Sequence, residues 1–221
     1  MSAPNLSPIV PQAISVHAPA AQEVRVFVQP RHAPTEVFSV DALHDGTGWT
    51  AAVAVSEGDP YWLVVDDGPP LLDPHCRALV HTTDGPRSVW RAPWAVQPQG
   101  APLASPPIVY ELHVRGAGRT FAGCSDHLDH IAATGANVIE LMPIHPFDPS
   151  DNYWGYMPLV WGAVHGEYAA DPLHAAEEAA AFIAAAHGRG LHVWVDVVFN
   201  HTGEGNATMP TRSLRGLDDA H

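Results

Sequence analysis

Polar side chains stand at or just beyond the ends of three apolar segments of this chain. They are Glu111, His113, Glu140, His145, Asn200 and His201. Carboxylates, imidazoles and amides hydrogen-bond polar ligands, and ligands of a parallel α/β sheet or barrel meet the C-terminal ends of its strands. The pattern therefore predicts a binding site at those ends, although a loop histidine such as His145, taken singly, is more often a packing residue.

An aromatic segment, DNYWGYMPLVW, follows the second of these apolar segments. Its large rings are Tyr153, Trp154, Tyr156 and Trp161. Flat rings in a loop stack on flat apolar faces, which sugars, aromatic ligands and partner proteins all present.

One acid, Asp196, is surrounded by valines in the segment GLHVWVDVVFNHTGEGN. A carboxylate in a buried strand is costly unless it is hydrogen-bonded or paired. Asp196 must therefore have a partner, and its role is either structural or site-organising.

The second half of the chain alternates between strand and helix patterns. Strands are expected at 108–114, 137–144 and 191–199, and helices at 125–135, capped by Ser125, and 171–190. This βαβ alternation predicts a parallel sheet.

The first half shows period-2 alternation instead. Strands are expected at 23–29, 35–40, 48–55 and 61–67, separated by turn-forming residues. The predicted domains are a flexible N-terminus (1–20), an antiparallel β-sandwich (21–83), a Pro-rich linker (84–107) and an α/β part (108–221).

Composition excludes several classes of function. The 221 residues carry 24 acidic and 10 basic side chains, a formal charge of −14, which argues against nucleic acid or an anionic membrane as partner. Two distant cysteines and the lack of a signal pattern favour the cytoplasm. His127 and His130, three residues apart, are expected to be surface histidines rather than a metal pair.

Together these motifs resemble the alpha-amylase family, glycoside hydrolase family 13. The matching segments are IVYELHVRG (108–116), ANVIELMPIHPF (136–147), NYWGY (152–156) and DVVFNH (196–201). The continuation from His201 to Asp219 is similar to the isoamylase and glycogen debranching branch, and the early strands resemble the carbohydrate-binding-like, immunoglobulin-like sandwich of that branch. The resemblance implies a sandwich followed by about three β/α units of a (β/α)8 barrel.

The resemblance also implies roles for individual residues. Tyr156, Trp154 and His201 would bind the substrate, and Asp196 and Asn200 would organise the site. Asn200 resembles a calcium ligand of many amylases, but debranching relatives often lack that ion. No metal or cofactor is therefore expected.

The bond-breaking groups are expected elsewhere. Retaining glycosidases use two carboxyl groups about 5 Å apart, and the family places its nucleophile, acid/base and third carboxylate after later strands, beyond residue 221. Glu111, Glu140 and Asp196 do not match those positions. The parent enzyme is expected to hydrolyse α-1,6 branch linkages of glycogen-like glucans, and this chain alone is expected to be inactive.

Other functions remain open. The parent could be a glycogen branching enzyme or a trehalose-releasing hydrolase, which share the layout of sandwich and barrel. The chain could instead be a non-catalytic glucan-binding protein. The sequence does not predict the oligomeric state.

Overall fold

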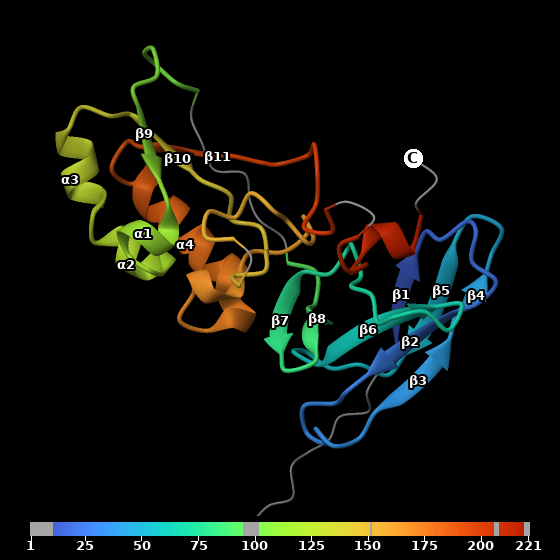
Figure 1. Ribbon diagram of the computed structural model, residues 1–221. Helices are drawn as coiled ribbons and strands as arrows, with labels where there is room; N and C mark the ends of the chain where they lie inside the picture. Colours follow the sequence, from blue (N-terminus) through green and yellow to red (C-terminus); the bar gives the residue numbers. More distant parts are fainter. Residues whose placement is uncertain (1–10, 95–101, 151, 206–207, 219–221) are drawn as a thin grey trace, which may run out of the picture.

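The structure is a computed structural model that describes residues 11–94, 102–150, 152–205 and 208–218. Antiparallel sheets come first, and a parallel sheet with helices follows (Figure 1). The antiparallel strands are β1 (Gln12–Val16), β2 (Val24–Val28), β3 (Phe38–Asp41), β4 (Leu43–His44), β5 (Trp49–Val53), β6 (Pro60–Val65), β7 (Ala78–Thr82) and β8 (Gly85–Val89). The predicted order of antiparallel sheets and then parallel β/α units is confirmed.

Two sheets, ordered β1-β5-β4 and β3-β2-β6-β8-β7, make up the sandwich. Strand β2 shows why these residues form it: Val24, Val26 and Val28 are at most 1% exposed, and the residues between them are only partly buried. This alternation is what a strand with one buried face requires. The buried residues of both sheets form one apolar cluster, the sandwich core.

Two strands lie outside the borders expected for the sandwich. β1 falls within the segment 1–20 that was expected to be flexible, but it pairs with β5 along its whole length and buries Ile14 and Val16. β8 falls within the expected linker and pairs with β7. Those two expectations are therefore wrong at 12–16 and 85–89, while residues 1–10 and 95–101 lie outside the described residues. The division into domains otherwise stays a prediction.

The second half contains a three-stranded parallel sheet, ordered β11-β10-β9. Its elements are β9 (Val109–Leu112), α1 (Val114–Ala117), α2 (Phe121–Ser125), α3 (Leu128–Ala133), β10 (Val138–Leu141), the 3-10 turns η1 (Gly166–Tyr168) and η2 (Pro172–His174), α4 (Ala175–His187), β11 (His192–Val195) and the turn η3 (Leu214–Gly216). In the described part of the chain, no helix has the length and apolarity needed to span a membrane.

Helix α4 is built on alanine, the residue with the highest helix propensity. Glu177 and Glu178 stand in its first turn, where negative charge interacts favourably with the helix dipole. The helix buries Phe182 against the same core as Leu112 and Leu141 of the sheet.

Two local expectations in this half are wrong. Ser125 does not cap the helix expected at 125–135, because it is the last residue of α2 and α3 begins at Leu128. Asp196 is not inside a buried strand: β11 ends at Val195 and lies at a sheet edge, with the side chain of Trp194 41% exposed.

The loops after β10 and β11 are anchored on the sandwich. Leu159 and Val160 from the first loop and Leu217 from the second belong to the sandwich core. The N–H of Leu72 also donates to the carbonyl of Arg212 at 2.7 Å, and the red helical turn near the C-terminus lies beside β1 (Figure 1). The sandwich therefore fixes the loops that carry the predicted site residues.

Candidate active site

One hydrogen bond connects the predicted aromatic loop, which follows β10, with the segment after β11. The hydroxyl of Tyr156, in the loop after β10, donates to Oδ2 of Asp196 at 2.7 Å. Asp196 lies immediately beyond β11, and its N–H donates to the carbonyl of Leu141 in β10 at 2.8 Å. The partner that the sequence required for Asp196 is therefore Tyr156.

This contact also changes the chemistry of the tyrosine. The hydrogen bond to Asp196, together with burial and the charges of Asp196, Glu111 and Glu140, raises the pKa of Tyr156 to about 12. The phenol therefore stays protonated at neutral pH and remains a donor. Glu111 and Glu140 are direct partners in the register of β9 and β10, which places both carboxylates on one face of the sheet.

A tight turn places Tyr156. The side-chain oxygen of Asn152 accepts the N–H groups of Trp154 at 2.7 Å and of Gly155 at 3.0 Å. Gly155 has φ +87°, and a Cβ there would lie 2.8 Å from the carbonyl oxygen of Pro143. Only glycine fits this position without a backbone shift.

The exposed aromatic rings pack around a buried histidine. Trp154 is 52% and Tyr153 46% exposed, and their ring centres lie 5.1 and 5.0 Å from that of His113. His113 accepts the N–H of Gly116 at Nδ1, and its Nε2 lies 3.2 Å from the hydroxyl of Tyr168. His113 therefore supports the aromatic loop from below and leaves Trp154 available to a ligand.

Asn200 and His201 lie together at the surface. The side-chain amide of Asn200 is 2.9 Å from Nδ1 of His201, and both residues are exposed. Nearby, the indole N–H of Trp161 donates to the carbonyl of Val198 at 2.8 Å, which ties the two loops a second time. The structure thus brings Tyr156 and Asp196 into contact, pairs Asn200 with His201, and gives no described contact between the two pairs.

His145 is half-buried beside the carbonyl of Ala163, at 3.4 Å from Nδ1. Burial lowers its pKa below the ordinary histidine value. The packing role that a single loop histidine usually has therefore fits His145.

The sequence did not single out two residues that shape these loops. Glu204 is 3% exposed, and its carboxylate accepts backbone N–H groups from Arg212, Ser213 and Arg215. The guanidinium of Arg115 lies over the ring of Tyr153 at 5.4 Å. The position of Arg115, two residues after His113 at a strand end, could have indicated it, whereas the partners of Glu204 depend on tertiary contacts.

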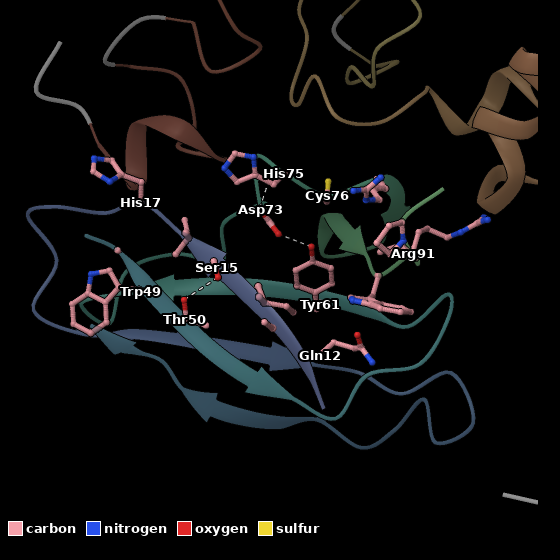
Figure 2. Close-up of a pocket in the computed structure, with 18 of the residues that line it drawn as sticks. Gln12, Ser15, His17, Trp49, Thr50, Tyr61, Asp73, His75, Cys76 and Arg91 are labelled. Atoms are coloured by element: carbon pink, nitrogen blue, oxygen red, sulfur yellow. Dashed lines mark hydrogen bonds between the residues drawn. The ribbon is translucent and has the colours of Figure 1, made fainter. Parts of the chain in front are cut away.

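A groove of 570 Å³ lies on the sandwich beside β1 (Figure 2). Several of its polar groups have partners within the protein: the hydroxyl of Tyr61 donates to Asp73 at 2.6 Å, and Arg91 pairs with Glu57 and Glu177. The predicted sugar-site residues do not line this groove.

No group of three or more potential metal ligands occurs within the ranges that the structure describes. His127 and His130, the pair considered in the sequence, are both exposed.

Solved structures share this arrangement. A pullulanase complexed with maltotetraose from Anoxybacillus sp. LM18-11 superimposes with a TM-score of 0.76 at 23% identity, over 96% of this chain and 36% of that one. A putative alpha amylase from Salmonella typhimurium gives a TM-score of 0.68 at 27% identity, over 91% of this chain and 33% of that one.

Curated relatives are debranching and related enzymes. Isoamylase SU1, chloroplastic, of Zea mays is 35% identical over 136 residues, which cover 51% of this chain and 17% of the relative. The protein named glycogen operon protein GlgX homolog of Haemophilus influenzae is 33% identical over 195 residues, covering 73% of this chain and 29% of the relative. This chain thus spans less than a third of the length of either protein.

The family match covers the part of the chain that contains the parallel sheet. Residues 104–214 match the catalytic domain of alpha amylase. They include β9, β10 and β11, the aromatic loop and the contact between Tyr156 and Asp196. The chain therefore belongs to the alpha-amylase family, as its motifs predict.

Proposed function

We propose that this chain forms part of the α-glucan-binding site of a debranching glycoside hydrolase of the isoamylase type. Tyr156, Trp154 and His201 contact the sugar, while Asp196 and Asn200 position the groups around it. The hydrogen bond between Tyr156 and Asp196 carries this proposal. It joins two loops at the C-terminal ends of parallel strands, where barrel enzymes bind their substrates.

In this proposal the parent enzyme hydrolyses α-1,6 branch linkages of a glycogen-like glucan with retention of configuration. That chemistry needs a nucleophilic carboxylate and an acid/base carboxyl group about 5 Å apart. We assign neither role to a residue of this chain. The chain holds a sugar next to the cleavage point, and the purified 221-residue chain should release no reducing sugar from glycogen.

The names of the relatives support the debranching reaction. Besides the isoamylase, a protein named glycogen debranching enzyme from Klebsiella pneumoniae is 34% identical over 133 residues, covering 51% of this chain and 20% of the relative. A second candidate is a trehalose-releasing reaction. The malto-oligosyltrehalose trehalohydrolase of Rhizobium sp. is 35% identical over 174 residues, covering 73% of this chain and 27% of the relative.

Trp154→Ala should weaken glucan binding roughly tenfold, because a central aromatic contact commonly contributes this much. Tyr156→Phe should have a smaller effect, since it keeps the ring and removes only the hydrogen bond to Asp196. Retardation of the purified chain in native gels containing glycogen measures both effects.

Trp94→Ala is the matched control, because Trp94 is also an exposed tryptophan, at 42%, and lies outside the proposed site. It should migrate like the parent chain. Equal retardation of the unsubstituted chain and the Trp154→Ala variant would show that Trp154 does not contact the glucan. Release of reducing sugar by the unsubstituted 221-residue chain would instead show that catalytic groups are present.

A further inference from the structure

A second pocket lies next to the aromatic loop, and two of its six lining residues are arginines. Its volume is 560 Å³, and its lining consists of Arg115, Arg119, Thr120, Pro149, Tyr153 and Glu167. It lies where the chain leaves β9 and enters α1 and α2, and its lining residue Tyr153 contacts the ring of Trp154. Of these residues, only Tyr153 belongs to the aromatic segment that the sequence singles out.

The lining of this pocket carries more positive than negative charge, with two arginines and one glutamate. Arg115 pairs with Glu167 at 2.7 Å and lies over the rings of Phe147 and Tyr153. Across the described ranges, no hydrogen bond or ion pair is found for Arg119. The pocket therefore keeps one net positive charge, within a chain whose formal charge is −14.

The backbone holds Arg119 in a fixed and costly conformation. Its φ of +67° lies in the left-handed region, which residues other than glycine seldom adopt. Next to it, Gly118 and Gly123 pack backbone against backbone: a Cβ on Gly123 would lie 2.1 Å from the carbonyl oxygen of Gly118. This close packing fixes the backbone of the loop, so the Cα of Arg119 is held at the pocket before any ligand binds.

We propose that this pocket binds a phosphate monoester attached to a sugar. A guanidinium group makes two parallel hydrogen bonds to a phosphate, and this geometry makes arginine the preferred residue for such anions. The sugar part follows from Tyr153, which lines the pocket and whose ring contacts that of Trp154 edge-on at 5.0 Å. A ligand with its phosphate at Arg119 and its sugar ring toward Trp154 would fill the pocket and also contact the aromatic loop.

The sugar part of this inference rests on the proposed function, whereas the anion part is independent of it. The negative charge of the whole chain repels anions at long range, so the attraction must come from the local arginines and must weaken with salt. The phosphate could be an ester on a glucan chain or part of a free sugar phosphate. Both present the same group to Arg119.

Calorimetric titration of the full chain at low ionic strength tests the anion part. Inorganic phosphate, glucose 6-phosphate and maltotriose are the three probes. Arg119→Gln should weaken binding of both phosphate probes roughly tenfold, the loss expected for one charge-assisted contact, and should leave maltotriose binding unchanged. Arg77→Gln, which removes another exposed arginine, this one on the sandwich, should change none of the three.

Each outcome decides a separate point. Equal phosphate affinity in the parent chain and the Arg119→Gln variant would overturn the proposal. Glucose 6-phosphate that binds no more tightly than inorganic phosphate would overturn its sugar part. If maltotriose fails to bind while the phosphate probes depend on Arg119, the proposed function fails and the anion site stands.

Gels with a phosphate-bearing starch glucan, before and after phosphatase treatment, distinguish the two sources of phosphate. If treatment weakens retention of the parent chain but not of Arg119→Gln, the ligand is the ester on the glucan. If treatment changes neither, while glucose 6-phosphate still depends on Arg119, the ligand is the free sugar phosphate. Thermal melts of each variant, followed by circular dichroism, show that the fold is intact.

Discussion

Replacing Glu204 with alanine should lower the free energy of unfolding by about 3 kcal/mol, because a buried carboxylate with several charge-assisted hydrogen bonds is lost. Its oxygens accept the N–H groups of Arg212 and Ser213, each at 2.8 Å, and of Arg215 at 3.2 Å. Without the carboxylate, these three N–H groups, of which that of Ser213 is buried and the others partly buried, lose this acceptor. Urea unfolding followed by circular dichroism measures the loss.

Two variants sharpen this prediction. Glu204→Gln keeps one carbonyl oxygen and should lose less stability than the alanine variant. Glu36→Ala removes an exposed carboxylate and should change stability by less than about 0.5 kcal/mol. If Glu204→Ala unfolds at the same urea concentration as Glu36→Ala, the carboxylate does not hold this loop.

The chain should lose stability as the pH falls from about 6.5 towards 5. His165 is 1% exposed and stacks on Phe147 with ring centres 4.2 Å apart. Burial, with smaller contributions from the charges of His81 and Arg115, lowers the pKa of His165 to about 3.

The sign follows from proton binding. In the unfolded chain this histidine takes up a proton near pH 6.5, whereas in the folded chain it does so only near pH 3. Between these values the unfolded state binds more protons, so acid favours unfolding. Burial also lowers the pKa of His81, His113 and His145, which act in the same direction.

His165→Phe isolates this contribution, because phenylalanine keeps a planar ring against Phe147 and cannot be protonated. Between pH 6.5 and 5, this variant should lose about 2 kcal/mol less than the parent chain, since one proton corresponds to about 1.4 kcal/mol per pH unit. Urea unfolding at a series of pH values measures the difference. His130→Phe, at an exposed position, controls for the general effect of replacing a histidine. Parallel stability curves for the parent chain and His165→Phe would contradict this account.

The sequence predicted those parts of the fold that follow from local patterns. The alternation around Val26 predicted β2, and the alanine-rich segment predicted α4. β1 was not predicted, because prolines flank its short alternating segment and favour a loop. In the folded chain, pairing with β5 makes this segment a strand despite those prolines. Pairing between distant segments is a tertiary effect that composition and periodicity do not contain.

The candidate site shows the same limit. The cost of a lone acid among valines predicted that Asp196 needs a partner. The identity of that partner, Tyr156, required the turn at Gly155 and the approach of two loops. The buried Glu204 gave no local signal at all, because its three donors lie 8, 9 and 11 residues further along the chain.

The anchoring of Leu217 in the sandwich core has a consequence for synthesis on the ribosome. The sandwich begins near the N-terminus, yet its core includes Leu217, and the hydroxyl of Ser213 lies 3.4 Å from the carbonyl of Leu72, 141 positions earlier in the chain. Contacts between such distant segments form late and slow the search for the native state. The sandwich therefore cannot complete its core until Leu217 has left the ribosome. Until then, Leu71 and Leu72 remain exposed to solvent. During that interval it is open to aggregation and to capture by chaperones.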